Sequence, residues 1–278
     1  MAYAKKVNPK TKLKLSSVDD VAPKKSTIIL YGDAASGKST FASTFPGPYF
    51  IVPAISANEM KVLKGSGLEN NIVVFDTITE MYEQVQVLAE TIKQGKLPDC
   101  HTIVFDNLTS AQTLAEQELR EKSTGDSPGW KEWGEFSNLW KSMLYILHQL
   151  PVHIIWITHS QVKEEKPQHG IPHSVGTFTL IGKSKGFIPS NSDMILYCET
   201  RDEGAPNPAF RVNLKTQGMW LSRVRGDKER VKKLPTHLGG SVTKNKKLKN
   251  VDPHYDDLAK LLGWPSQVEV EDGVDEQT

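Results

Sequence analysis

Short apolar runs and longer amphipathic segments alternate over the first two thirds of the chain. The apolar runs are rich in β-branched residues and predict strands. Residues 78–95 instead repeat apolar side chains at three- and four-residue steps, which predicts a helix that Gly95 and Pro98 end. The alternation indicates an α/β fold with a largely parallel sheet, and the closely spaced later strands indicate an antiparallel extension. The expected strands are residues 26–31, 48–53, 71–75, 101–106, 152–157, 193–198, 210–214 and 219–221, and the expected helices are residues 39–45, 78–95, 109–122, 133–150 and 254–264.

The segment between the first strand and the first helix fits the pattern G-x-x-x-x-G-K-[ST] of a phosphate-binding loop. Strand, glycine loop and helix form the context that phosphate binding requires, because backbone N–H groups and the helix N-terminus then face the phosphates. Lys38 is expected to reach the β- and γ-phosphates of ATP, and Ser39 to offer its hydroxyl to Mg²⁺. The predicted nucleotide-binding residues are Gly32, Asp33, Ala34, Ala35, Ser36, Gly37, Lys38, Ser39 and Thr40.

Polar residues follow two of the later predicted strands. Asp106 ends the strand 101–106, where a carboxylate can hold the water shell of Mg²⁺ beside Ser39. Thr158, His159, Ser160 and Gln161 follow the strand 152–157 and are expected at the carboxyl edge of the sheet, where open α/β folds bind ligands. His159 is therefore a candidate sensor of the γ-phosphate, with a simple strand-ending role as the alternative.

Length and composition narrow the class of protein. A chain of 278 residues can bury a sizeable core, and its net charge of +1 neither favours nor excludes nucleic acid as a partner. Cys100 and Cys198 are far apart and form no metal-binding pair, which fits a reducing compartment. No apolar run is long enough to cross a membrane, and no secretory signal is visible, so we expect a cytoplasmic protein.

The order and spacing of these pieces resemble the phage-type RecA-like P-loop proteins, including the Sak-group ATPases of single-strand annealing and recombination. The resemblance lies in residues 32–40, Phe45-Pro46-Gly47-Pro48, residues 103–109, a Trp-containing helix and residues 155–159. It implies a RecA-like core, binding of ATP and Mg²⁺, single-stranded DNA as a partner, and assembly into homo-oligomers. A single-strand-binding protein is a further possible partner, and a phage-encoded chain would work in the host cytoplasm.

Composition and the extent of this resemblance together suggest a division of the chain. We expect a basic arm at residues 1–23, a RecA-like ATP-binding domain at residues 24–240, a basic segment with a short helix at residues 241–266, and an acidic tail at residues 267–278. The tail has little apolar content and is expected to lack fixed structure.

One departure from the RecA-like pattern concerns the residue that activates water. RecA-like enzymes keep a carboxylate just after the second strand, but here that strand runs into Val52-Pro53-Ala54-Ile55. Glu59 is the nearest acid, and Asp76 at the end of the third strand competes with it. Catalysis is therefore assigned to Lys38, Asp106, Glu59 and His159, and Arg223 or Arg225 is a candidate donor to a neighbouring subunit's site.

The predicted DNA contact lies in residues 162–191, a segment rich in glycine, lysine and proline that we expect to be a mobile basic loop. Its candidate DNA-binding residues are Lys163, Lys166, Lys183 and Lys185, with the basic stretch 223–250 as the alternative site.

Two other classes of function stay open at this stage. A P-loop kinase acting on a small molecule would need arginines near the phosphates, and no arginine precedes residue 120, which weighs against it. A nucleotide-gated assembly factor without DNA contact is the other alternative.

Overall fold

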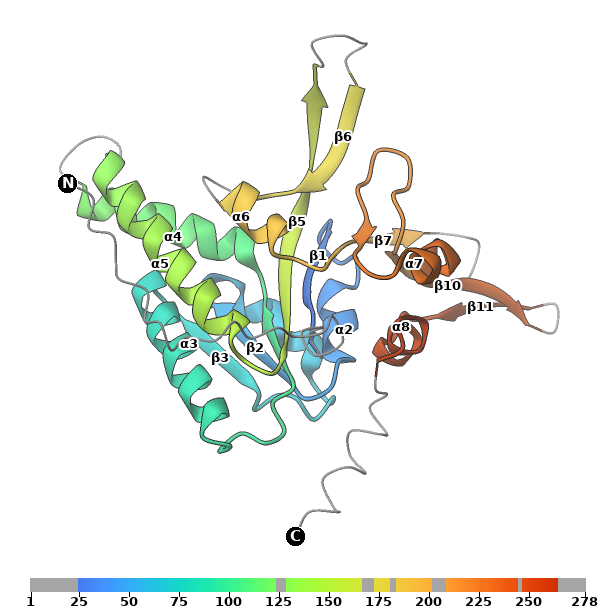
Figure 1. Cartoon of the computed structure of the whole chain (residues 1–278), viewed down its shortest axis with the longest axis horizontal. Helices are drawn as coiled ribbons and strands as arrows, with labels where there is room; N and C mark the ends of the chain where they lie inside the picture. Colours follow the sequence, from blue (N-terminus) through green and yellow to red (C-terminus); the bar gives the residue numbers. More distant parts are fainter. Residues whose placement is uncertain are drawn as a thin grey trace, which may run out of the picture.

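The computed structural model describes residues 25–123, 129–166, 173–180, 184–201, 209–244 and 247–264. The predicted arm at residues 1–23 and the predicted tail at residues 267–278 lie outside these ranges. Within them the chain forms one mixed sheet with helices on both faces (Figure 1). The strands are β1 (Thr27–Gly32), β2 (Pro48–Pro53), β3 (Ile72–Phe75), β4 (Thr102–Phe105), β5 (His153–Glu165), β6 (His173–Phe178), β7 (Met194–Arg201), β8 (Ala209–Asn213), β9 (Arg223–Val224), β10 (His237–Lys244) and β11 (Lys247–Val251). The helices are α2 (Lys38–Ser43), the 3-10 segment η1 (Ala54–Leu63), α3 (Ile78–Lys93), α4 (Leu108–Lys122), α5 (Trp130–His148), α6 (Ser184–Ser190), α7 (Lys228–Lys233) and α8 (Tyr255–Leu262).

The sheet has the order β11-β10-β8-β7-β1-β5-β4-β2-β3. Strands β3, β2, β4, β5, β1 and β7 pair in parallel, whereas β8 and β10 add antiparallel strands beyond β7. The predicted α/β fold with a largely parallel sheet and an antiparallel extension is therefore confirmed.

Two apolar cores lie on opposite faces of the sheet because successive strand residues point to opposite sides. In β1, Ile29 and Tyr31 pack beneath α3, α4 and α5, whereas Ile28 and Leu30 pack beneath α2, η1 and α8. Both faces of the central strands are thus buried, which explains why their sequences are continuously apolar. No helix in the described ranges is long and apolar enough to span a bilayer.

Residues 162–191 do not form the single loop that the composition predicted, and that prediction is wrong. β5 continues to Glu165 and pairs with β6 in an antiparallel hairpin that projects beyond the sheet (Figure 1). Gly176 brings β6 against the ring of Trp220: a Cβ atom there would lie 2.1 Å from the indole. Main-chain hydrogen bonds from β5, together with this contact, hold residues 173–178 as a strand. The sequence of this segment, taken alone, indicated only a polar, glycine-rich loop.

The predicted strand at residues 219–221 is also wrong. Gln217 and Trp220 hydrogen-bond each other across a tight turn, with N–O distances of 3.1 and 2.9 Å, and the strand that follows is β9. Gly218 has a φ of 55°, a conformation that glycine adopts readily. Trp220 packs on β6 and β7, and its ring stacks on that of Tyr197 at 4.3 Å, whereas Met219 and Leu221 are exposed.

The C-terminal elements are joined to the main sheet. β10 pairs with β8, and α8 buries Tyr255, Leu258 and Leu262 in the core beneath α2. The proposed boundary between residues 240 and 241 falls inside β10. Cys100 and Cys198 are buried free thiols, and burial raises the pKa of each to about 12.

Candidate functional site

A cavity of about 440 Å³ opens at the carboxyl ends of β1 and β4, beside the middle of β5. The cavity is formed by the loop between β1 and α2, the start of α2, the residues that follow β4, the middle of β5, and single residues from η1 and β8. This position agrees with the general placement of ligands at the carboxyl edge of open α/β sheets. The lining residues are Ala34, Ala35, Ser36, Gly37, Lys38, Ser39, Thr40, Val62, Asp106, Asn107, His159 and Phe210.

The two glycines of the predicted phosphate loop are required by close backbone approach. At Gly32 a Cβ atom would lie 2.1 Å from the carbonyl oxygen of Cys198. Gly37 has a φ of 82° and faces the ring of Phe210, which a Cβ atom would meet at 2.9 Å. Both contacts hold the loop against β7 and β8, so that α2 begins at the cavity with its N-terminus open to it.

The side chain of Lys38 folds back over its own loop. Its Nζ donates hydrogen bonds to the carbonyl oxygens of Gly32 at 3.1 Å and Asp33 at 2.6 Å, and to Oγ of Ser36 at 3.3 Å. The residue is only 7% exposed. These three oxygen atoms hold the ammonium group at the cavity. Phosphate oxygens could take their place as hydrogen-bond acceptors.

Ser39 and Asp106 meet across an intervening strand. β5 lies between β1 and β4, so Asp106 reaches the start of α2 from two strands away. Oγ of Ser39 donates a hydrogen bond to Oδ2 of Asp106, and Asp106 is only 2% exposed. The backbone N–H of Asp106 donates to the carbonyl oxygen of Ile51 at 3.0 Å, which ties this turn to β2.

The paired hydroxyl and carboxylate suit a hard cation such as Mg²⁺, which prefers oxygen ligands. No cluster of three or more His, Cys, Asp or Glu side chains that could hold a metal occurs in the part of the chain that the structure describes. A magnesium ion at this site would therefore need further oxygen ligands from water and from a bound phosphate, which is how Mg²⁺ usually binds in nucleotide sites. The residues present fit that kind of site.

The middle of β5 carries the third predicted group. His159 lines the cavity, and its backbone N–H donates to Oγ1 of Thr109 at 3.1 Å. Thr158 is fully buried and its hydroxyl donates to the carbonyl oxygen of Thr179 at 2.7 Å. Nε2 of Gln161 donates to the carbonyl oxygen of Phe178 at 2.6 Å, so that amide supports the hairpin.

Ser160 contacts the phosphate loop directly, which the sequence alone did not indicate. Its Oγ donates a hydrogen bond to Oδ1 of Asp33. On the other side of the loop, Oγ1 of Thr200 donates to the carbonyl oxygen of Ala35 at 3.2 Å. Burial and the Asp33 carboxylate together raise the pKa of Tyr197, behind the loop, to about 12. The loop is thus connected to the root of the β5–β6 hairpin and to β7.

The candidates for water activation are not gathered at the cavity in the same way. Glu59 belongs to η1, whose Val62 lines the cavity, but the side chain of Glu59 lies outside what the structure describes. Asp76 is exposed at the end of the edge strand β3, with β2 between β3 and β4. Among the described residues that line the cavity, Asp106 alone carries a carboxylate.

Both candidate trans arginines bind the end of α6 in their own chain. Nη2 of Arg223 donates to the carbonyl oxygens of Pro189 at 2.8 Å and Ser192 at 3.4 Å. Nη2 of Arg225 donates to the carbonyl oxygen of Ser190 at 2.9 Å and remains exposed. Burial lowers the pKa of Arg223 from its usual value. Neither arginine lines the cavity of its own chain.

The four candidate DNA-binding lysines lie on different elements. Lys163 is exposed on β5, and Lys166 follows β5 and pairs with Glu164 at 3.4 Å. Lys185 is exposed on α6, and Lys183 lies outside the described residues.

Three further cavity residues escaped the sequence analysis: Val62, Asn107 and Phe210. Asn107 follows Asp106 directly and caps α4 by accepting from the N–H of Ser110 at 2.8 Å, so an Asn before a predicted helix was a usable signal. Val62 and Phe210 come from distant segments and carry no local signal of a site.

Comparison with known proteins gives a matching family model and similar solved structures. A family model described as an AAA domain matches residues 24–233. Among solved structures, the chain is similar to the RadB recombinase, with 15% sequence identity, a TM-score of 0.45, and coverage of 83% of this chain and 92% of that chain. A search of the curated proteins finds no match. The family match runs from the strand before the phosphate loop through α7 and so includes every residue of the cavity.

Proposed function

Because this chain belongs to the AAA-domain family of P-loop ATPases, we propose that it binds ATP with Mg²⁺, hydrolyses it, and binds single-stranded DNA in phage recombination or annealing. The observation that carries the ATPase part of this proposal is the meeting of Lys38, Ser39 and Asp106 in one cavity at the N-terminus of α2.

Each of these residues has a role that follows from its contacts. On ATP binding, Lys38 exchanges the carbonyl oxygens of Gly32 and Asp33 for oxygens of the β- and γ-phosphates. Ser39 would hold Mg²⁺ directly, and Asp106 would hold water bound to the ion. The ion, when bound, offsets negative charge on the phosphates. The N–H groups of the loop and the start of α2 orient the phosphate chain.

The attacking water needs a group that orients it, and Glu59 is our candidate because η1 borders the cavity. Asp76 is set aside because its strand lies at the far edge of the sheet. His159 is our candidate sensor of the γ-phosphate, since it directly follows the buried part of β5 and lines the cavity. Basal turnover should therefore be slow until DNA or a neighbouring subunit completes the site.

The β5–β6 hairpin is the proposed DNA-binding element. It begins where β5 leaves the cavity, and the Ser160–Asp33 hydrogen bond joins its root to the phosphate loop. A change in the nucleotide can therefore alter the hairpin through a short contact path. Lys163 and Lys166 on the hairpin, and Lys183 and Lys185 near α6, would contact the phosphate backbone.

Assembly into a homo-oligomer would place one subunit's basic residues near its neighbour's cavity. Arg225 is the stronger candidate donor in trans because it is exposed, whereas Arg223 is half-buried and bound to the end of α6. A single-strand-binding protein remains a proposed partner, and the cytoplasm the proposed location.

A nucleotide-gated assembly factor without DNA contact is the second candidate, and one observation favours it. The described part of the hairpin carries Lys163 and Lys166 but also Glu164 and Glu165, so its lysine charge is balanced. A small-molecule kinase has no comparable support, since the described lining of the cavity contains no arginine.

The test is ATP turnover with and without single-stranded DNA, combined with DNA binding in ATP, ADP and a non-hydrolysable analogue. Stimulation by DNA together with nucleotide-dependent DNA affinity supports the first candidate. Turnover that DNA leaves unchanged, with no DNA binding in any nucleotide, supports the second.

A further inference from the structure

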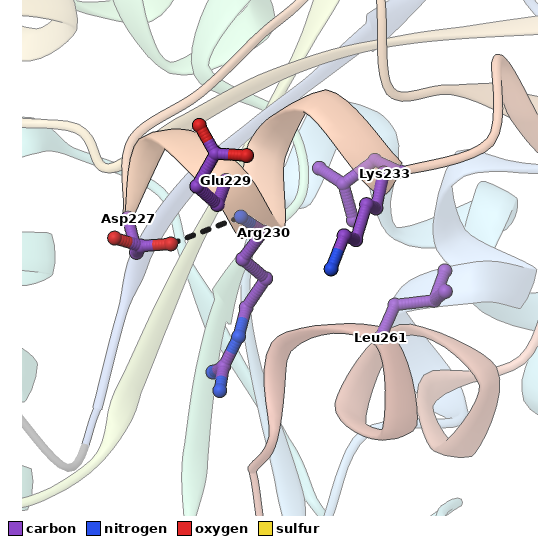
Figure 2. A pocket seen from close by; sticks show the side chains of 6 residues that line it. Asp227, Glu229, Arg230, Lys233 and Leu261 are labelled. Atoms are coloured by element: carbon purple, nitrogen blue, oxygen red, sulfur yellow. Dashed lines mark hydrogen bonds between the residues drawn. The ribbon is translucent and has the colours of Figure 1, made fainter.

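A second cavity, of about 300 Å³, lies between α7 and α8 and shares no residue with the nucleotide cavity. Asp227, Glu229, Arg230, Lys233 and Leu234 border it from α7 and its flanks, and Leu261 borders it from α8 (Figure 2). We call it the α7–α8 groove. Its volume is at the lower end of ligand sites, so it suits one or two side chains better than a nucleotide.

The acidic side chains of the groove are engaged by their own helix. Oδ1 of Asp227 accepts the N–H of Arg230 at 3.0 Å. Oε1 of Glu229 pairs with Nζ of Lys232 at 2.7 Å. Lys232 thus offsets the charge of Glu229, and the carboxylate of Asp227 caps the N-terminus of α7, at the opposite end of the helix from Lys233.

The cations of the groove face α8. The guanidinium of Arg230 extends toward α8 and donates to the carbonyl oxygen of Leu262 (Figure 2). The ammonium of Lys233 points into the gap between the two helices, and within the described residues it has no ion-pair partner. Leu234, only 4% exposed, and Leu261 supply apolar surface beside it. The groove thus offers positive charge over a small apolar floor, which fits an acidic segment with interspersed apolar residues.

The chain itself supplies such a segment next to the groove. α8 ends at Leu262, and the N–H of Trp264 donates to the carbonyl oxygen of Ala259 at 2.9 Å, which fixes the point where the chain leaves. The sequence then continues Pro265-Ser266-Gln267-Val268-Glu269-Val270-Glu271-Asp272. An extended chain spans up to about 3.5 Å per residue, so Glu269 can reach about 17 Å from Trp264. Leu261 in the groove lies only three residues before Trp264.

We propose that residues 266–272 bind the α7–α8 groove of their own chain, with valines on Leu234 and Leu261 and carboxylates on Lys233 and Arg230. Val268 and Val270 alternate with Glu269 and Glu271, and alternate residues of an extended segment point to opposite sides. One side therefore meets the apolar floor while the other carries the charges that the lysine attracts. The bound segment covers cations of the basic stretch 223–250 that would otherwise be open to nucleic acid. This consequence, but not the binding itself, rests on the proposed function.

The test is carbodiimide cross-linking of the full chain at low salt, which joins a lysine amine to a carboxylate only where the two are in contact. Peptide mass spectrometry should find Lys233 joined to Glu269 or Glu271. The product should be lost in Lys233→Gln and in the double variant Glu269→Gln/Glu271→Gln. Lys232→Gln is the matched control, because Lys232 is a neighbouring exposed lysine of the same helix that does not line the groove. About 1 M salt, where the screening length is about 3 Å, should also remove the product.

A mixture of isotope-labelled and unlabelled chains identifies the occupant. Products within one chain support the proposal, and mixed products would assign the groove to the tail of a second copy and overturn it. Tail cross-links spread over Lys228, Lys232 and Lys260, unchanged by Lys233→Gln, would also overturn it. The experiment needs neither ATP nor DNA, so its failure is distinct from failure of the proposed function.

Discussion

Removing the ammonium group of Lys38 should weaken ATP binding without unfolding the protein. In Lys38→Ala the phosphates lose a charged donor, while the carbonyl oxygens of Gly32 and Asp33 lose the acceptor role that they have in the free chain. A hydrogen bond to a charged group contributes about 1.5–3 kcal/mol net, because the lysine exchanges one set of acceptors for another. This corresponds to an increase of about 10- to 150-fold in the dissociation constant of ATP.

The assay is a calorimetric titration of ATP into the wild-type chain, Lys38→Ala and a matched control. Lys64→Ala is a suitable control because Lys64 is exposed at the end of η1 and does not line the cavity. The control should keep wild-type affinity. Thermal unfolding of all three proteins shows whether each remains folded, since Lys38 is itself a buried residue.

The result that refutes the reasoning is a folded Lys38→Ala variant with wild-type ATP affinity. Lys38 would then be only a brace for the loop, and the cavity would not bind phosphates in the proposed way. A loss of affinity together with a loss of folding decides neither, and Lys38→Met, which keeps the length of the side chain, is then the variant to titrate.

Four further predictions follow from the same geometry. Asp106→Asn should reduce single-turnover ATP hydrolysis by about 10- to 100-fold, the usual cost of losing an outer partner of a metal, and wild-type rates would overturn the site assignment; the same assay on Glu59→Gln tests the water-activating role. Neutralising the four candidate DNA lysines should lower both DNA affinity and its dependence on salt in filter-binding titrations; no change would move the DNA site to residues 223–250. Deleting residues 267–278 should leave ATP binding intact and tighten DNA binding at low salt, because the tail carboxylates would no longer compete with DNA phosphates for the basic stretch 223–250. Weaker DNA binding would contradict this competition. His153 is buried, which lowers its pKa to about 4 from 6.5 and keeps the folded ring neutral, so its contribution of about 3 kcal/mol is complete above pH 6.5 and lost as pH falls toward 4; denaturant unfolding at several pH values should show this fall, and His153→Gln should flatten it.

The local chemistry of the site could be read from the chain alone. A glycine loop between a strand and a helix has one common function, because its backbone geometry presents N–H groups to phosphate. The continuous apolar runs of β1, β4 and β5 reflected burial on both faces, and burial of this kind requires helices on both sides of a sheet. The α/β class and the largely parallel sheet could therefore be predicted from local sequence patterns.

The sequence did not reveal which segments become neighbours. Ser39 meets Asp106 because β5 lies between β1 and β4, and strand order depends on packing across the whole sheet rather than on any local period. Phe210 faces Gly37 for the same reason, although 172 residues separate them in the chain.

The β5–β6 hairpin and the α7–α8 groove were decided by tertiary structure alone. Residues 160–165 are polar except for Val162 and were not predicted as a strand, yet β6 supplies hydrogen-bond partners for their backbone, and the ring of Trp220 fits against Gly176. Likewise the sequence shows a basic stretch at residues 223–250 and predicts a helix at residues 254–264, but only the packing of α7 on α8 places Lys233 beside Leu261. Side-chain type and spacing determine the secondary structure and chemistry that a segment favours. Backbone hydrogen bonds and contacts between distant segments determine its position in the fold and its neighbours.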